Sequence, residues 1–266
     1  MGRPPATRAF RPLPDKTSTR DYEPSYDLGG TFATEGHARA EELVADVPGW
    51  LRPEDALKLY ELAYCAEGPI LEIGTYRGKS GTLMALATRD AGSPVAIVSV
   101  DVDPGAQRDA AAVAVAKGVG DRLWLVRGTA AAFFASNPSF TPSLVFLDGD
   151  HSYAAVRRDL AVVEPHIPSS GLLLLHDYLD PRNDDPSDEE FEVFRAAGDS
   201  WLVEQCEFAG TFGACGLFRR TQGGSERPTV GAFDLRRYDS PRLQYLQRVR
   251  WPAGRALRRA FGRSRT

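Results

Sequence analysis

Carboxylates and imidazoles gather in four short stretches of the sequence, and each stretch follows a run of apolar residues. These stretches are Glu72-Ile73-Gly74, Asp101-Val102-Asp103, Asp148-Gly149-Asp150-His151 and His176-Asp177. Such side chains accept hydrogen bonds from hydroxyls, bind cations or exchange protons. Phosphate sites are normally lined by basic groups, so these acids favour a ligand that carries hydroxyls, an amine or a positive charge.

The glycine-rich stretch LEIGTYRGKSG, residues 71–81, contains the Gly-Lys-Ser that also ends a phosphate-binding P-loop. A P-loop needs four residues between its two glycines, whereas three residues separate Gly74 from Gly78. The sequence also lacks the Gly-x-Gly-x-x-Gly of dinucleotide sites, which argues against an NAD-type oxidoreductase. Asp101 lies about one strand–helix–strand unit after the glycines, where an acid commonly binds ribose hydroxyls.

Five apolar runs alternate with helical patterns between residues 68 and 178. The runs are PILEIG, VAIVSVDVDP, DRLWLVRG, SLVFLDGD and GLLLLHDY. This alternation predicts an α/β fold, a doubly wound and mainly parallel Rossmann-like sheet with helices on both faces. The later segments SWLVEQCEF and ACGLFRR predict a closing hairpin at the sheet edge. Ligands of such sheets bind at the carboxyl ends of the strands, where the four polar stretches lie.

The chain of 266 residues divides into three predicted parts. Residues 1–36 are rich in Pro, Gly and Thr and read as an irregular N-terminal extension. Residues 37–220 form the α/β domain, including N-terminal cover helices, one of which begins at Pro53. Residues 221–266 form a basic, partly helical C-terminal tail.

The net charge of −4 conceals an uneven distribution, because the chain from Arg219 onward holds 13 Arg and three acids. Such a tail can bind the acidic body, a second subunit in a homo-oligomer, or, weakly, an anionic membrane surface. Nucleic acid is a less favoured partner, because the rest of the chain is acidic. The sequence has no signal-peptide pattern, no apolar run of bilayer length and only three cysteines, so we expect a cytoplasmic protein.

The stretch from Glu72 to Ser80 resembles the first motif of class I S-adenosylmethionine-dependent methyltransferases, and within them of the catechol-type and macrolide-sugar O-methyltransferases. The resemblance covers residues 68–180 and implies that S-adenosyl-L-methionine is the cofactor. It places the acid of the second strand, Asp101, at the ribose and the loop of residues 127–130 beside the adenine. The implied cofactor site comprises Glu72, Gly74, Thr75, Tyr76, Gly78, Ser80, Asp101, Thr129 and Asp148.

The same resemblance implies that Asp148, His176 and Asp177 bind a divalent metal and that His151 is the general base. Mg²⁺ or another divalent cation could hold two hydroxyls of an acceptor and lower the pKa of one of them. The related enzymes carry a carboxylate where His176 stands, and imidazole suits Zn²⁺, Mn²⁺ or Fe²⁺ better than Mg²⁺. Three alternatives therefore stay open: a three-residue site, a site of the two aspartates alone, or a base without a metal.

These residues together predict an enzyme that methylates a hydroxyl of a sugar or small secondary metabolite, with an aromatic diol as the next choice. The acidic segment 179–190 is expected to cover the acceptor as a mobile lid or disordered loop. His151 would also fit a helix N-terminus, and His176 could instead orient Asp177. Two other functions remain: a catalytically silent binding or assembly protein, and an oxidoreductase on a similar sheet.

Overall fold

The computed structural model describes residues 39–185, 187–188 and 190–221. The predictions for the N-terminal extension and for the basic tail concern residues outside these ranges. The described residues form one seven-stranded sheet with the strand order β3-β2-β1-β4-β5-β7-β6. Its strands are β1 (Ile70–Ile73), β2 (Ile97–Asp101), β3 (Leu123–Arg127), β4 (Leu144–Leu147), β5 (Leu172–Leu175), β6 (Cys206–Phe212) and β7 (Cys215–Arg220).

The first five strands pair in parallel, while β7 runs antiparallel to β5 and to β6. The doubly wound fold class and the closing hairpin are therefore confirmed. One detail of the hairpin prediction was wrong. Trp201–Glu204 forms a single helical turn, α9, so β6 starts only at Cys206. Leu202 of that turn packs into the hydrophobic core on one face of the sheet.

Side chains alternate between the two faces of the sheet, so each face has its own hydrophobic core. On β1, Ile70 belongs to one core and Leu71 to the other. The neighbouring strand β4 behaves in the same way, with Phe146 on the first face and Leu147 on the second. Strands buried on both faces need apolar residues at successive positions, which explains the continuous apolar runs in the sequence.

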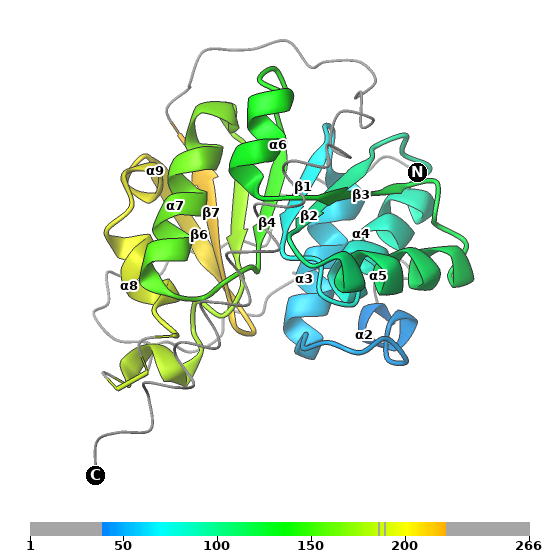
Figure 1. Cartoon of the computed structure of the whole chain (residues 1–266), viewed down its shortest axis with the longest axis horizontal. Helices are drawn as coiled ribbons and strands as arrows, with labels where there is room; N and C mark the ends of the chain where they lie inside the picture. The colour runs from blue at the N-terminus through cyan, green and yellow to red at the C-terminus, as the bar shows by residue number, and fades with distance from the viewer. Residues whose placement is uncertain (1–38, 186, 189, 222–266) are drawn as a thin grey trace.

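Helices cover both faces of the sheet (Figure 1). The first face carries α2 (Ala40–Leu43), α3 (Pro53–Cys65), α4 (Lys79–Asp90) and α5 (Pro104–Ala116). The second carries α6 (Ala130–Ser136), α7 (Tyr153–Val163), α8 (Val193–Gly198) and α9. Two short 3₁₀ helices, η2 (Glu164–His166) and η3 (Pro181–Asp184), complete the described elements. Within this part of the chain, every helix is too short or too polar to span a bilayer.

Local sequence determines where several helices begin. Pro53 is the first residue of α3, as predicted, and Asp55 accepts a hydrogen bond from the Arg52 amide at 2.9 Å. Asp103 and Thr129 cap α5 and α6 by accepting hydrogen bonds from backbone amides of the first turn. These helix starts follow the carboxyl ends of strands, so they face the edge of the sheet where ligands are expected.

Candidate active site

The carboxyl ends of β1, β2, β4 and β5 lie side by side because the strands are neighbours in the sheet. Backbone hydrogen bonds continue the ladder past the strand ends: Gly74 donates to Val100 at 2.9 Å, and Asp148 donates to Ile73 at 2.8 Å. His176 donates to Leu147 at 3.0 Å in the same way. The four polar stretches of the sequence therefore meet at one edge, as the parallel fold predicts.

The loop after β1 is held by the carboxylate at the end of β2. Asp101 accepts hydrogen bonds from the Thr75 amide at 2.8 Å and the Tyr76 amide at 3.1 Å. Its second oxygen accepts from the Asp103 amide at 2.8 Å. A carboxylate offers about four acceptor positions, so Asp101 keeps room for a further donor such as a ribose hydroxyl. Asp101 is only partly buried, which leaves that position accessible.

Two glycines allow this loop to turn closely around its neighbours. Gly74 has a φ of +99°, and a Cβ at this position would lie 2.1 Å from the backbone oxygen of Asp148. Gly78 has a φ of +80°, and its Cβ would lie 2.6 Å from the Cβ of Ala110 on α5. Tyr76 also has a positive φ, of 43°, and its ring stacks on Trp50 at the surface. The glycines therefore permit close packing against β4 and α5 rather than phosphate binding.

Glu72 lies beneath this loop rather than facing the site. It is fully buried, and its two oxygens accept hydrogen bonds from the hydroxyls of Ser80 and Ser99. Burial raises the pKa of Glu72 to about 8, and the two serine hydroxyls only partly oppose this rise. Ser99 also bonds to the Thr75 hydroxyl at 2.7 Å, which links Glu72 to the loop. The direct cofactor contact expected for Glu72 is therefore corrected to a supporting position beneath the loop.

Ser80 and Thr75 share this buried environment, and only 6% and 1% of their surfaces are exposed. Their hydroxyls bond to Glu72 and Ser99, so a contact with a ligand would have to involve other atoms of the loop. Thr129 lies in the loop after β3, as expected. Its hydroxyl accepts a hydrogen bond from the Ala132 amide at 3.1 Å and caps α6.

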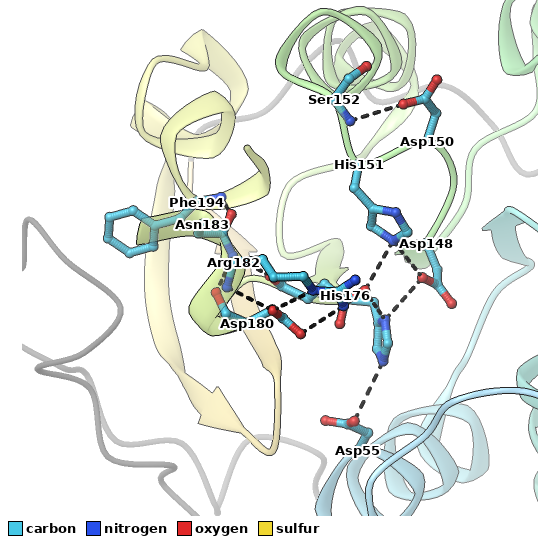
Figure 2. A network of polar contacts seen from close by, with 11 residues as sticks. Asp55, Asp148, Asp150, His151, Ser152, His176, Asp180, Arg182, Asn183 and Phe194 are labelled. Carbon is cyan, nitrogen blue, oxygen red and sulfur yellow. Dashed lines mark hydrogen bonds and ion pairs between the residues drawn. The ribbon is translucent and has the colours of Figure 1, made fainter. Parts of the chain in front are cut away.

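The predicted metal ligands and the predicted base form one cluster (Figure 2). His176 Nδ1 lies 3.0 Å from Asp148 Oδ1 and 3.2 Å from Asp177 Oδ2. His151 Nε2 lies 3.5 Å from the same Asp148 oxygen and 3.1 Å from the same Asp177 oxygen. The cluster is open on one side only, because the exposed fraction of the side chain is 29% for His151 and 6% for His176.

The two carboxylates and the two imidazoles shift one another's pKa values. Burial disfavours the charged form of His151, but Asp148 and Asp177 outweigh it and raise its pKa to about 9. Burial opposes protonation of His176 as well, and the same two carboxylates nevertheless raise its pKa well above 6.5. Burial would raise the pKa of each aspartate, yet the two rings hold both values below the usual range. Without a metal, the cluster therefore holds two cationic rings between two anionic carboxylates.

The donor atoms of this cluster fit a divalent transition metal. Three buried ring nitrogens, His151 Nε2 and both nitrogens of His176, make no hydrogen bond of good geometry among the described residues. Four donors that surround one ion tetrahedrally at about 2.1 Å lie about 3.4 Å from one another. The four distances above, 3.0 to 3.5 Å, are close to that separation. With His151 kept as the base, the ligands are one imidazole and two carboxylates, and the imidazole suits Zn²⁺, Mn²⁺ or Fe²⁺ better than Mg²⁺.

The segment after β5 packs against His151 from the side. Phe191 stacks on the His151 ring with centroids 4.6 Å apart, and the Arg182 guanidinium lies 3.6 Å from the centre of the Phe191 ring. Asp180 accepts hydrogen bonds from Arg182 at 2.9 and 3.0 Å. Asn183 ties the turn to the Asp177 backbone oxygen at 2.8 Å, and Figure 2 shows Asp180, Arg182 and Asn183 close together. Residues 180–184 therefore form a hydrogen-bonded turn, so this part is not the disordered loop that was one of the two expectations. The mobile lid, the other expectation, stays a prediction.

The sequence reasoning missed Asp55, which lies on α3 and reaches the far side of His176 (Figure 2). Its Oδ2 atom is 3.5 Å from His176 Nε2, and its side chain is fully buried. Its Oδ1 atom accepts a hydrogen bond from the Ala214 amide at 2.7 Å, in the turn between β6 and β7. In the sequence, Asp55 stands in the first turn of α3, where an acid predicts only a helix-capping role, so nothing there signals a contact with His176. Only the packing of α3 against the sheet reveals its partner.

Comparisons with known proteins agree with this fold. Residues 71–178 match the family model described as a methyltransferase domain. The O-methyltransferase TomG from Streptomyces achromogenes, solved with SAM, is 18% identical with a TM-score of 0.52, covering 72% of this chain and 92% of that chain. The O-methyltransferase from Bacillus cereus, solved with SAH, is 13% identical with a TM-score of 0.54, covering 71% and 92%.

A third similar structure is the SAH-bound methyltransferase PaMTH1 from Podospora anserina, at 15% identity and a TM-score of 0.52, covering 71% of this chain and 89% of that chain. Because the identities are this low, these structural matches establish a shared fold and no more. The family match adds the kind of domain, and it spans β1 to β5 with the strand ends described above. Residues 71–178 therefore match a methyltransferase domain, and the sheet that contains them has the Rossmann-like fold of the solved O-methyltransferases.

Proposed function

We propose that this protein transfers a methyl group from S-adenosylmethionine to a hydroxyl oxygen, assisted by a divalent metal. The observation that carries the proposal is the cluster of Asp148, His151, His176 and Asp177 at the edge where the β1 loop also lies. Several solved structures of the same fold are O-methyltransferases with SAM or SAH bound, which supports the cofactor and the oxygen acceptor.

The cofactor in this proposal lies along the loop after β1, with its ribose at Asp101. The loop is already ordered by the Asp101 carboxylate, so cofactor binding need not pay its full ordering entropy. The sulfonium of S-adenosylmethionine is positive, and the carboxylates at this edge give it a favourable electrostatic surrounding. This electrostatic match also disfavours NAD, whose pyrophosphate is anionic.

The metal in this proposal is held by Asp148, His176 and Asp177. A bound divalent cation would hold the acceptor hydroxyl and lower its pKa. A bound cation would also compensate the two carboxylates that keep His151 protonated. The neutral His151 ring would then be the base for the acceptor proton, because it lies in the same cluster and is its most exposed member. Phe191 stacks on the His151 ring, which limits its rotation and keeps Nε2 directed at the cluster.

The acceptor proposed here is a small molecule with two neighbouring hydroxyls, such as a sugar or another secondary metabolite. Two vicinal hydroxyls can occupy two positions on one cation, which fixes the reacting oxygen in line with the methyl group. TomG is described as involved in tomaymycin synthesis, and this description supports a secondary-metabolite acceptor without identifying one. An aromatic diol is the alternative acceptor of the same kind.

Isothermal titration calorimetry with SAH, SAM and NAD tests the cofactor. We expect SAH and SAM to bind and NAD not to bind. Binding of NAD alone would support the oxidoreductase, and binding of none of the three would support a catalytically silent protein. The same titration on metal-free protein tests whether SAH binding needs the metal. We expect that it does not, because Asp148 is the only residue common to the proposed cofactor site and the proposed metal site.

Metal removal separates cofactor binding from chemistry. We expect dialysis against a chelator to abolish methyl transfer to a vicinal diol while SAH still binds. Adding Mn²⁺, Fe²⁺ or Zn²⁺ should restore turnover more effectively than adding Mg²⁺, because one of the three proposed ligands, His176, is an imidazole. Full turnover in the chelated sample would contradict the metal and leave a mechanism in which His151 acts alone.

A further inference from the structure

The imidazole of His176 separates two groups of possible metal ligands, one at each ring nitrogen. Its Nδ1 atom faces Asp148 and Asp177, and its Nε2 atom faces Asp55. Cys215 joins Asp55 in a second group of possible ligands around His176. A metal ligated by this histidine must therefore use one nitrogen or the other, and the protein has to determine which nitrogen keeps its proton.

Accessibility favours the Nδ1 side. Asp148 and His151 expose 23% and 29% of their side chains, so a metal and an acceptor can reach them. On the other side, Asp55 and Cys215 are fully buried, and an acceptor has no route to an ion held there. The carboxylate of Asp55 is thus placed behind the ring, on the side away from the opening.

We propose that Asp55 is a positioning residue that keeps the proton on His176 Nε2 and thereby presents Nδ1 to the metal. This inference rests on the metal-assisted function proposed above. A histidine that binds a metal through one nitrogen usually directs the other N–H to a carboxylate, and losing such a partner weakens metal affinity by about 10- to 100-fold. Asp55 Oδ2 lies 3.5 Å from His176 Nε2, which places a carboxylate beside that nitrogen although the two atoms make no hydrogen bond of good geometry here.

The position of Asp55 is itself fixed from two directions. The Arg52 amide at the start of α3 donates to one oxygen at 2.9 Å, and the Ala214 amide in the β6–β7 turn donates to the other at 2.7 Å. Gly213 makes this approach feasible, since a Cβ there would lie 2.2 Å from Asp55 Oδ1. A carboxylate held by two backbone amides cannot swing away from the ring, so it can define the proton position.

The variant Asp55→Asn tests the proposal, because an amide can present N–H to His176 Nε2 and so favours the tautomer that carries its proton on Nδ1. We expect the affinity for Mn²⁺ or Zn²⁺ to fall at least 10-fold by competition with a chromophoric chelator, while SAH affinity is unchanged. The matched control is Glu61→Gln, the same carboxylate-to-amide change at another buried position of α3, where the partner is Lys58 at 2.6 Å. This control should keep the wild-type metal affinity.

A measurement on the wild-type protein does not depend on the variant folding. In protein labelled with ¹⁵N-histidine and loaded with ¹¹³Cd²⁺, we expect the metal to couple to Nδ1 of His176 and the proton to stay on Nε2. Coupling to Nε2, or a cadmium shift typical of thiolate ligation by Cys215, would overturn the proposal. Equal metal affinity of Asp55→Asn and Glu61→Gln would overturn it too.

The outcomes also separate this inference from the function on which it rests. If Cd²⁺ couples to none of the histidines and no divalent metal binds, the metal-assisted function itself is rejected, and the role of Asp55 with it. If the metal binds at Asp148 and Asp177 but its affinity is the same in Asp55→Asn as in the wild type, the function stands and only the role of Asp55 is rejected.

Discussion

At the scale of single residues, Asp101 combines two tasks at the end of β2. It holds the Thr75 and Tyr76 amides and still has a position for a ligand hydroxyl. We expect Asp101→Ala to weaken SAH binding by about 1.5–3 kcal/mol, the value of one charge-assisted hydrogen bond. Calorimetry would measure this loss. The control is Asp103→Ala, which removes only the cap of α5 and should leave SAH affinity near that of the wild type.

His151 is the residue on which the proposed chemistry depends most directly. We expect His151→Ala to leave SAH affinity intact and to slow methyl transfer by about 10²–10⁴-fold, because the general base is lost. Single-turnover kinetics at saturating cofactor would measure the effect. His166→Ala is the matched control, since His166 stacks on Phe134 at 3.8 Å on the second face of the sheet. Wild-type turnover by the His151 variant would remove the proposed base.

Glu72 gives a prediction for the pH dependence of stability. Its pKa is about 8 in the folded protein against an ordinary value of 4.5, so the folded state binds the extra proton between these pH values. This group therefore lowers the free energy of unfolding as pH rises through that window, by up to ~1.4 kcal/mol per pH unit. Glu72→Gln should gain stability relative to the wild type on going from pH 5 to pH 8. Urea unfolding at both pH values would show it, and a constant difference between the two proteins would contradict it.

Individual side chains show what the sequence could and could not predict. Asp148, His151, His176 and Asp177 were expected to meet, because parallel strands place their carboxyl ends at one edge. The support given by Glu72 was not expected, since a strand-ending acid looks the same in sequence whether it faces a ligand or two buried serines. Asp55 was missed for a related reason: its partners lie 121 and 159 positions away in the chain.

At the scale of elements, the loop between β1 and α4 needs glycine at position 74 both for its backbone conformation and for close packing. A variant of Gly92, which follows α4 and has a similar positive φ, isolates the conformational part. Gly92 has a φ of +62° with open space around it, so Gly92→Ala should cost about 1–2 kcal/mol of backbone strain. Gly74→Ala adds a clash with the Asp148 backbone oxygen and should lose clearly more stability. Urea unfolding compares the two. Equal losses would show that the loop can move away from β4.

The elements themselves were largely predictable, because continuous apolar runs of four or five residues match strands buried on both faces. The one-turn helix α9 was not predicted, since a single turn rich in apolar residues has no periodicity that distinguishes it from a strand. The hydrogen-bonded turn of η3 was not predicted either. Its order depends on Asp180, Arg182 and Asn183 bonding to one another, which composition alone does not reveal.

At the scale of the whole molecule, every contact that the structure describes at the proposed site is made by residues between 39 and 221. We therefore expect a chain that ends at residue 221 to bind SAH and a divalent metal as tightly as the full chain does. The basic tail would then attach the protein to an anionic membrane surface. The full chain should co-sediment with vesicles that contain anionic lipid, and the shortened chain should stay in the supernatant. Loss of SAH binding in the shortened protein would instead show that the tail contributes to the site.

The hydrogen bond from the Ala214 amide to Asp55 joins the start of the domain to its last hairpin. On the ribosome, the helix that carries Asp55 emerges about 150 residues before the strand turn that fixes it, so this carboxylate has no native backbone partner in the hairpin for most of synthesis. If His176 binds the proposed metal, it would do so late in synthesis, and a chain that stops before β7 should retain less divalent metal through purification than the full chain does.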